Sequence, residues 1–172
     1  MQQTLIIYST TDGQTQRICE RITQASNKAK LVSIAQTAEE MLANYDQIVI
    51  GASIRYGKHQ PAVYKFIEQN RTLLEEKKTA FFSVNVVARK PEKNTPDTNP
   101  YMQKFLELSG WTPDILAVFA GKINYPKYGF LDKHMIRLIM YMTKGPTDTS
   151  QTYEFTDWAK VDGFAETLAN QK

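Results

Sequence analysis

The chain has 172 residues with a formal net charge of +3 and 42% hydrophobic residues, which suits one domain with a sizeable core. The small positive charge suits anionic ligands but is too weak to indicate nucleic acid. The lone Cys19 excludes an internal disulfide framework, and we expect neither a signal peptide nor a membrane span, because the opening residues form a strand and no apolar run is long enough.

The chain opens with an apolar strand that leads into a hydroxyl-rich turn and a helix. Residues 5–8 are continuously apolar, as in a parallel strand buried on both faces, and the helix runs from Gly13 to about Ala25. The turn offers hydroxyls and free N–H groups at a helix N-terminus, which suits a phosphate without a metal. It lacks the P-loop and GxGxxG spacings. Two interpretations are about equally compatible with the pattern: a turn that binds a monophosphate such as that of FMN, and a ligand-free turn in which Thr11 or Asp12 caps the helix.

The next two strands lead to a second polar loop. Residues 30–34 form a short strand, and residues 46–53 form a buried strand that ends in small residues. In the loop that follows, Tyr56 offers a flat apolar face and Arg55 a planar cation. Ligands bind beyond the carboxyl ends of the strands in open parallel sheets, so this loop is a candidate binding element.

The second half of the chain contributes two more strands and a long third loop. After a helix opened by Pro61, residues 78–84 form a fourth strand, and residues 115–123 form a fifth. The loop over residues 83–101 contains three prolines, and loops of this length are usually functional or disordered. Alternating strands and helices predict a doubly wound parallel sheet in the order 2-1-3-4-5, which brings the three loops together.

A segment that this fold does not require follows the fifth strand, from residue 124 to about residue 152. A helix-like stretch over residues 131–144 is apolar nearly all round, apart from a basic stripe of Lys133, Arg137 and Lys144. Such a helix suits an anionic membrane surface or a place packed on the sheet, and one face can serve each purpose. We expect a single domain over residues 1–172 that carries this insertion.

Four blocks of sequence resemble the flavodoxin-like family, and within it the menaquinone-dependent protoporphyrinogen IX dehydrogenases of bacterial haem synthesis. The blocks are YSTTDGQT, VIGASIRYG, SVNVVARKPEKNTPDTN and the insertion helix with its RLIM core. Asp12 departs from the usual flavodoxin phosphate loop, but the resembled dehydrogenases also carry an acid there. The resemblance implies an α/β flavodoxin-like fold with a helical insertion in or after strand five, and FMN as the cofactor with no metal.

The resemblance also implies which residues surround FMN. The first loop would hold the phosphate, the second would border the isoalloxazine with Tyr56 as a stacking partner, and the third would run along the other side of the ring. The implied cofactor-binding residues are Ser9, Thr10, Thr11, Asp12, Gly13, Gln14, Thr15, Ala52, Ser53, Ile54, Arg55, Tyr56, Gly57, Ser83, Val84, Asn85, Val86, Val87, Ala88 and Arg89. The polar residues 147–151 would close over the cofactor.

The implied reaction oxidises protoporphyrinogen IX to protoporphyrin IX and passes the electrons through FMN to a membrane quinone, menaquinone or ubiquinone. The substrate is an apolar disc with two propionates, which need cationic anchors. Besides Arg55, the candidate substrate-binding residues are Arg89, Lys90, Lys93, Lys58, Lys122 and Arg137. The candidate catalytic residues are Arg55 and His59. Histidine titrates in the right range for a base, but a solvent-facing His59, with water as the proton acceptor, stays open.

Two other functions stay open, a flavodoxin-type electron carrier and a soluble NAD(P)H:quinone oxidoreductase. Such carriers tend to be strongly acidic whereas this chain is basic, and no second dinucleotide signal indicates a nicotinamide site. The resemblance implies a cytoplasmic enzyme that contacts the inner membrane peripherally through the insertion helix. The sequence leaves a homo-oligomer and the quinone preference open.

Overall fold

A computed structural model describes residues 2–171, which fold around a parallel sheet. Its five main strands lie in the order β2-β1-β3-β5-β6, and neighbouring strands are parallel throughout. Their bounds are β1 Thr4–Ser9, β2 Ala29–Ser33, β3 Gln47–Arg55, β5 Lys78–Val84 and β6 Ile115–Phe119. The short β4 (Lys58–His59) only folds back on the end of β3. The expected order 2-1-3-4-5 is therefore confirmed for the five main strands.

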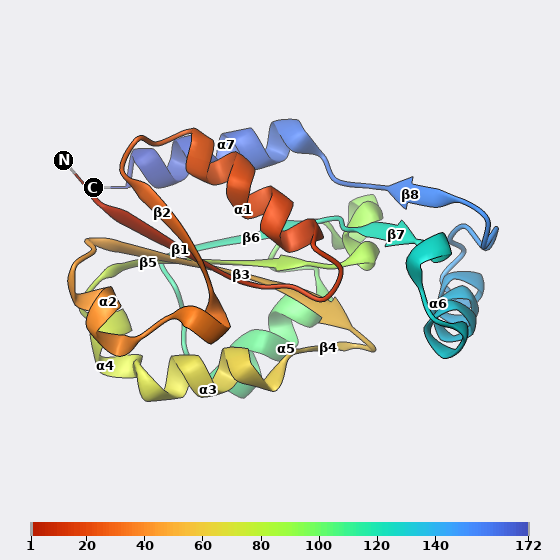
Figure 1. Cartoon of the computed structure of the whole chain (residues 1–172), viewed down its shortest axis with the longest axis horizontal. Coiled ribbons are helices and arrows are strands. Elements are labelled where there is room, and N and C mark those ends of the chain that lie inside the picture. Colours follow the sequence, from red (N-terminus) through yellow and green to blue (C-terminus); the bar gives the residue numbers. More distant parts are fainter. Residues whose placement is uncertain (1, 172) are drawn as a thin grey trace.

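Helices cover both faces of this sheet, as Figure 1 shows. One face carries α1 (Gln14–Gln24) and α7 (Trp158–Ala169). The other carries α2 (Glu39–Ala43), α3 (Pro61–Gln69), α4 (Arg71–Glu75) and α5 (Pro100–Ser109). Alternate side chains of each strand enter different cores, as the pleat requires. In β1, Leu5 and Ile7 enter one hydrophobic core, and Ile6 enters the other.

Two glycines are required by close approach or by backbone conformation. Gly51 in β3 lies under the ring of Phe82, where an added Cβ would come within 2.2 Å of a ring carbon. Gly13 precedes α1 with φ at 91°, a left-handed conformation that favours glycine. Gly13 itself is the N-cap residue of α1, so neither Thr11 nor Asp12 caps the helix, contrary to the ligand-free interpretation of this turn. Within the turn, Thr10 Oγ1 accepts a hydrogen bond from the N–H of Gly13 at 2.9 Å.

The insertion begins earlier than the sequence indicates. The strand expected over residues 115–123 is broken, because the parallel strand β6 ends at Phe119 and residues 120–121 belong to no strand. The separate strand β7 (Lys122–Asn124) pairs with β8 (Thr152–Glu154) in an antiparallel ladder that is not part of the main sheet. This ladder closes the insertion at its base and projects it beyond the carboxyl end of the sheet (Figure 1).

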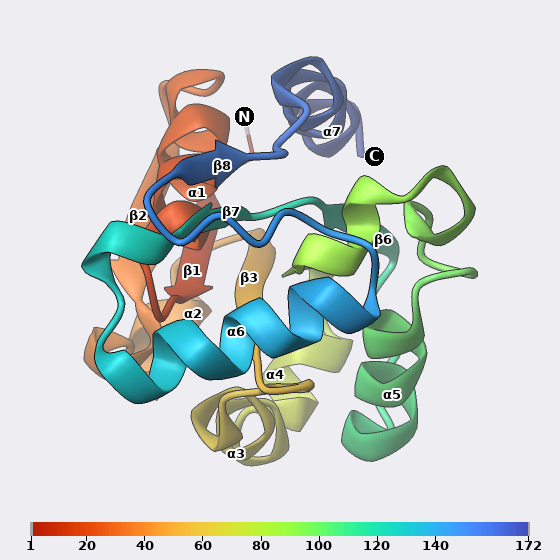
Figure 2. The ribbon, with the colours of Figure 1, turned by 90° about the vertical axis from the view of Figure 1, so that its right-hand side faces the viewer.

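Between β7 and β8, helix α6 (Phe130–Met142) lies across the carboxyl end of the sheet, which Figure 2 views face on. The buried Met140 and the half-buried Ile136 and Ile139 pack toward the body of the protein. The helix ends at Met142, and Lys144 adopts a left-handed conformation with φ at 57°. The expected helical stripe of three basic residues is therefore wrong at Lys144, and only Lys133 and Arg137 lie on the helix.

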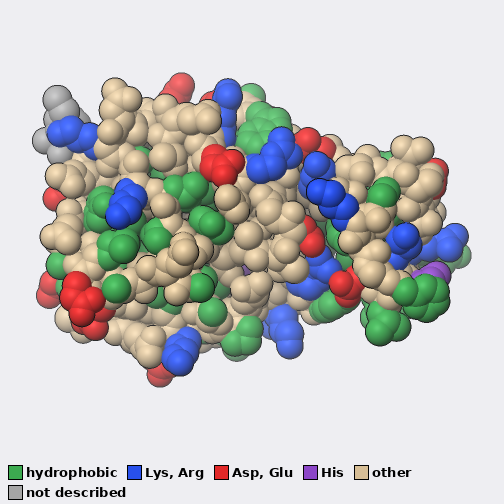
Figure 3. All heavy atoms as spheres, viewed as in Figure 1, with side chains coloured by type: hydrophobic (Ala, Val, Ile, Leu, Met, Phe, Trp, Pro, Cys, Tyr) green, Lys and Arg blue, Asp and Glu red, His purple; other side chains and the backbone are tan. Residues whose placement is uncertain are grey.

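The opposite face of α6 is apolar and exposed. Its large side chains are between 48% and 77% exposed, and they are Phe130, Leu131, Met135, Leu138, Tyr141 and Met142. In Figure 3 the end of the molecule that carries α6 shows apolar side chains beside lysine, arginine and histidine. No helix within residues 2–171 is long and apolar enough to cross a membrane. The helix thus packs with one face and presents the other, as the sequence allowed.

Candidate functional site

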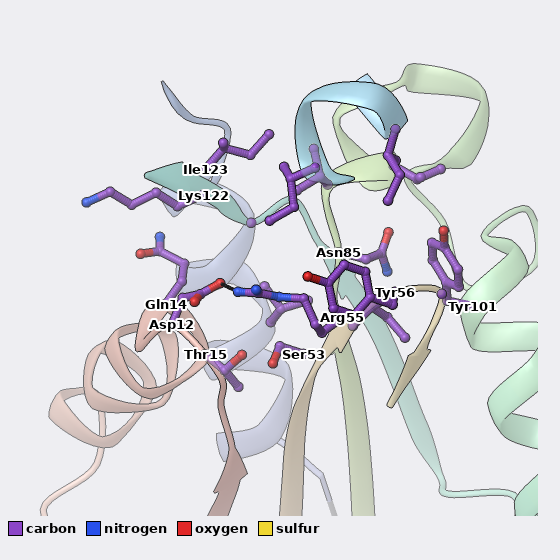
Figure 4. A pocket seen from close by; sticks show the side chains of 18 of the residues that line it. Asp12, Gln14, Thr15, Ser53, Arg55, Tyr56, Asn85, Tyr101, Lys122 and Ile123 are labelled. Atoms are coloured by element: carbon purple, nitrogen blue, oxygen red, sulfur yellow. Dashed lines mark hydrogen bonds and ion pairs between the residues drawn. The ribbon is translucent and has the colours of Figure 1, made fainter. Parts of the chain in front are cut away.

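The three loops and the insertion surround one hollow at the carboxyl end of the sheet, with about 820 Å³ of space that is partly open to solvent. Figure 4 shows side chains from the three loops and from the insertion directed into it. Lining residues that the sequence anticipated are Thr10, Asp12, Gln14, Thr15, Ser53, Ile54, Arg55, Tyr56, Gly57, Val84, Asn85, Val86, Val87 and Lys122. Others are Tyr101, Gly121, Ile123, Tyr128, Ile136, Ile139 and Met140.

Two buried hydroxyls in this hollow have no hydrogen-bond partner among residues 2–171. They are Oγ1 of Thr15, in the first turn of α1, and Oγ of Ser53, near the end of β3. A buried hydroxyl that is left unpaired costs about 1–3 kcal/mol, so such groups call for an explanation. Because the first-turn N–H groups of α1 and the positive end of its dipole lie at the same place, these residues fit a phosphate.

The first loop is held in place by a glutamine that the sequence analysis missed. Gln60, just before α3, accepts a hydrogen bond from Ser9 Oγ at 2.9 Å and donates to Thr11 Oγ1 at 3.3 Å. Gln14 reaches the insertion, because its amide donates to Glu154 Oε1 and Thr156 Oγ1, both at 2.9 Å. No local pattern marks Gln60, because its partners lie about fifty positions away in the sequence.

Arg55 bridges the first loop and the insertion across the hollow. Its guanidinium pairs with Asp12, toward which it extends in Figure 4, and lies 3.4 Å from the carboxylate of Asp132 in α6. The rings of Tyr56 and Tyr128 also lie beneath it, with centroids at 5.8 and 5.3 Å. Burial opposes the charged form, but the hydrogen bond and charge of Asp12 outweigh it and raise the pKa of Arg55. Asp12 is thus neutralised by Arg55, which removes its repulsion toward a nearby phosphate.

Tyr56 occupies a left-handed backbone position with φ at 52°, which is uncommon for a bulky residue. Its ring is 46% exposed, and its hydroxyl donates to Asp132. That hydrogen bond raises the pKa of Tyr56. The ring lines the hollow, so its face is available to a planar ligand.

The third loop folds into two 3-10 turns, η2 (Val86–Arg89) and η3 (Pro91–Lys93). Arg89 turns away from the hollow and clamps α6 instead. Its guanidinium donates to the carbonyls of Val86 and Thr143, both at 3.0 Å, and lies 5.9 Å from the ring centroid of Phe155. Burial lowers its pKa. Arg89 therefore ties the end of α6 to the third loop rather than meeting a ligand in the hollow.

His59 lies behind the hollow and does not line it. It is 2% exposed, its ring packs edge-on against Phe81 and Phe105, and its Nε2 lies 2.9 Å from Ser83 Oγ. Burial, with a contribution from Lys104, lowers the pKa of His59 to about 4. The solvent-facing alternative is therefore wrong, and the geometry gives no support to His59 as a base.

Several other residues named from the sequence lie outside the lining of the hollow. Among the expected cofactor contacts these are Ser9, Thr11, Gly13, Ala52, Ser83, Ala88 and Arg89. Among the expected substrate anchors they are Lys58, Lys90, Lys93, Arg89 and Arg137, which leaves Arg55 and Lys122 as the anticipated cations in the lining. The segment 147–151 does not line the hollow either.

The order of the five parallel strands defines an α/β protein of the flavodoxin fold class. Residues 5–150 match the family model described as a flavodoxin domain. The solution structure of two-electron reduced flavodoxin from Megasphaera elsdenii has a TM-score of 0.52, with 17% identity over 67% of this chain and 84% of that chain. This likeness shows the shared fold.

Two relatives identify a more specific family within the flavodoxin class. A protoporphyrinogen IX dehydrogenase (quinone) from Escherichia coli K12 is 45% identical, over 98% of this chain and 95% of the relative. Another with the same name, from Leishmania major, is 42% identical, over 96% of this chain and 74% of the relative. The chain belongs to this family of flavodoxin-domain oxidoreductases. The expectations of an oxidoreductase and of FMN as cofactor are thereby confirmed at the level of the family.

Proposed function

We propose that the protein oxidises protoporphyrinogen IX to protoporphyrin IX with FMN bound in the hollow and passes the electrons to a membrane quinone, menaquinone or ubiquinone, in haem synthesis. The observation that carries the cofactor site is the pair of buried hydroxyls without partners among residues 2–171, on Thr15 in the first turn of α1 and on Ser53 near the end of β3. The close relatives are named for this oxidation.

In this proposal each of the three loops contacts a different part of the cofactor. Thr15 and the first-turn N–H groups of α1 hold the phosphate, and Ser53 supplies a second hydroxyl. The second and third loops, over residues 54–57 and 84–87, border the isoalloxazine. Bound FMN supplies the capacity to accept electrons from the substrate and release them to a quinone, while the protein orients both molecules and tunes the electrostatics.

The substrate requires an apolar platform and an anchor for its propionates. Ile136, Ile139 and Met140 of α6 form an apolar wall of the hollow, and Arg55 and Lys122 are cations in its lining. Charge-assisted bonds to carboxylates are stronger than neutral ones. Arg55 already contacts Asp12 and Asp132, so a propionate would share or replace one of these partners. Because His59 is buried and does not line the hollow, we propose that water accepts the protons that the substrate releases.

The exposed face of α6 supports contact with the surface of an anionic membrane. Leu131, Met135, Leu138 and Met142 follow one another at helical spacing and are all about half exposed or more. Lys133 and Arg137 lie on the same helix. An apolar face with flanking cations suits the headgroup region of anionic lipids. Because the other face of α6 lines the hollow, this contact would bring the flavin near lipid-dissolved quinone on the cytoplasmic side of the inner membrane.

An anaerobic absorbance experiment tests the proposal. FMN-loaded protein is mixed with protoporphyrinogen IX or, separately, with NADH, and a menaquinone analogue in vesicles follows. We expect protoporphyrinogen to bleach the flavin, NADH to leave it oxidised, and the quinone to restore the colour. Bleaching by NADH alone would indicate an NAD(P)H:quinone oxidoreductase. A flavin that neither donor reduces would indicate an electron carrier of the flavodoxin type.

A further inference from the structure

Two buried asparagines, near the start and the end of the third loop, bind each other through both of their side-chain amides. Asn85, just after β5, donates to Oδ1 of Asn99 at 3.2 Å, and Asn99 donates to Oδ1 of Asn85 at 3.0 Å. Asn85 is 3% exposed and Asn99 is fully buried. Because Asn99 immediately precedes α5, the reciprocal pair fastens the start of the third loop to that helix.

Both side chains also form hydrogen bonds with the backbone, and Asn85 forms one with Ser83. Asn85 accepts from the N–H of Ala88 at 3.1 Å and donates to Ser83 Oγ at 3.1 Å. Asn99 accepts from the N–H groups of Tyr101 and Met102 at 3.2 and 3.3 Å and donates to the carbonyl of Lys93 at 2.9 Å. All four amide hydrogens are therefore used, and neither side chain has a donor left for a ligand.

The network continues to His59 and carries no charge. Ser83 Oγ accepts from Asn85, so its own hydrogen is free to donate to His59 Nε2 at 2.9 Å. This assignment requires the neutral imidazole, which its burial among aromatic rings favours. Fully satisfied buried polar networks rigidify the structure around them, so the network holds the end of β5 and the start of the third loop in one arrangement.

We propose that the Asn85–Asn99 pair is a positioning device that sets the place of the third-loop backbone against the flavin ring, and thereby the reduction potential of the flavin and its rate of reduction. The inference rests on the proposed function. Val84, Val86 and Val87 on the loop line the hollow, as does Tyr101 on α5, and Figure 4 shows Asn85 and Tyr101 on neighbouring elements. Since all the amide hydrogens of Asn85 and Asn99 are already bonded, Asn99 affects the flavin only through the position of the loop backbone.

The rival account is that Asn99 only caps α5, and one substitution separates the two. Asn99→Asp keeps an oxygen that accepts from the first-turn N–H groups, and aspartate is an equally good cap. The same change removes both amide donations, to Asn85 and to Lys93. Asn70→Asp is the matched control, because Asn70 is another buried asparagine whose amide donates to the Phe66 carbonyl, at 2.8 Å and away from the hollow.

The experiment compares FMN-loaded wild type, N99D and N70D. The midpoint potential is measured by anaerobic dye-coupled titration, the reduction rate by single-turnover mixing with protoporphyrinogen IX, and the melting temperature by thermal unfolding. We expect N99D to shift the potential and to slow flavin reduction about tenfold to a hundredfold, since small misplacements are costly. N70D should lower the melting temperature and leave the potential and the rate unchanged.

An N99D protein with the wild-type potential and rate would overturn the inference. Asn99→Ser, which keeps a helix cap, loses the reciprocal pair and adds no charge, should show the same slowing of flavin reduction and a shifted potential. A change in N99D that Asn99→Ser does not share would come from the added carboxylate and would also overturn the inference. Wild-type protein that takes up FMN but fails to oxidise protoporphyrinogen would contradict the proposed function alone, since the potential can still be measured. Wild-type protein that takes up no FMN would contradict both.

Discussion

At the residue scale, we expect the chemistry of the hollow to depend on two hydroxyl side chains without hydrogen-bond partners among residues 2–171. Within residues 2–171, four buried side-chain atoms have no hydrogen-bond partner. Gln2 Nε2 and Asn70 Oδ1 lie away from the hollow, whereas Thr15 Oγ1 and Ser53 Oγ belong to residues that both line it. A protein gains no stability from such groups. We therefore interpret the two hydroxyls as hydrogen-bond partners of the cofactor. Their removal should weaken FMN binding without lowering the stability of the FMN-free protein.

Replacing Thr15 by valine should weaken FMN binding about tenfold or more, because a hydrogen bond to a charged group is worth about 1.5–3 kcal/mol. The melting temperature of the FMN-free protein should stay the same or rise, because an unpaired buried hydroxyl is removed. Flavin fluorescence titration and thermal unfolding measure the two effects.

The control for this prediction is Thr4→Val at the opposite end of the sheet. Thr4 Oγ1 donates to Gln47 Oε1 at 2.8 Å, so this variant should lose stability and keep its affinity for FMN. Equal affinities for FMN in wild type and Thr15→Val would show that Thr15 does not serve the cofactor.

His59 predicts how the stability of the fold depends on pH. Its pKa is lowered to about 4, mainly by burial and also by Lys104, whereas an unfolded histidine has a pKa of about 6.5. Between these values the unfolded chain binds more protons than the folded one. The stability that neutral His59 contributes is thus complete above about pH 6.5 and is lost as the pH falls toward 4.

Over this window the wild type should lose about 3 kcal/mol more unfolding free energy than His59→Gln, since one pKa unit corresponds to about 1.4 kcal/mol. Denaturant unfolding at several pH values measures the difference, which should be constant above about pH 7. Parallel curves for the two proteins at all pH values would contradict the burial of a neutral imidazole.

At the element scale, Arg89 joins the C-terminal end of α6 to the third loop. It donates to the Thr143 carbonyl just after the end of α6 and to the Val86 carbonyl in the third loop. A cation at this position also complements the helix dipole. Arg89→Met should therefore loosen the insertion and leave the core of the sheet intact.

Hydrogen exchange tests this prediction peptide by peptide. Exchange in residues 130–142 should speed up in Arg89→Met, while exchange in β1 and β3 stays as in the wild type. Lys90→Met is the control, because Lys90 is the next residue and also a cation, whereas within residues 2–171 the side-chain hydrogen bonds to Thr143 come from Arg89. Unchanged protection of α6 in Arg89→Met would show that the clamp is dispensable.

The outer face of α6 makes the prediction about membranes. Leu138 and Met142 are 52% and 72% exposed, and burial of such side chains in an apolar phase contributes about 1.5–3 kcal/mol each. The double variant Leu138→Gln/Met142→Gln should lose at least about tenfold in binding to vesicles of anionic phospholipid, measured by co-sedimentation.

Leu108→Gln is the matched control, because Leu108 is 59% exposed on α5. It should bind vesicles like the wild type, and the binding of both should weaken with salt. Equal vesicle binding by the double variant and the Leu108→Gln control would remove α6 from the membrane contact.

At the scale of the whole molecule, the sequence predicts what depends on local pattern. Apolar runs such as residues 5–7 and 48–50 identify strands buried on both faces, and the structure buries them. Their alternation with helices predicts a doubly wound parallel sheet, and the order 2-1-3-4-5 of such sheets brings the three loops together. Most of the residues named on those loops line the hollow.

The sequence does not predict what depends on distant partners. The break after Phe119 occurs because β7 pairs with β8 about thirty residues later, and an apolar run carries no sign of that choice. The placement of Ile136 and Ile139 over the hollow depends on the same pairing. Likewise, burial of His59 is decided by Phe81 and Phe105 from other elements, so the sequence alone left its exposure open.

The central claim is that three loops and an inserted helix form one site in which FMN takes electrons from a porphyrinogen. The most direct measurement is the visible spectrum of FMN-free protein titrated with FMN and then mixed anaerobically with protoporphyrinogen IX. We predict saturation at one FMN per chain, followed by loss of the flavin absorbance, with one porphyrin formed for every three FMN reduced, because the oxidation releases six electrons and each FMN accepts two. Protein that takes up no FMN, or bound FMN that stays oxidised beside the porphyrinogen, would contradict the claim.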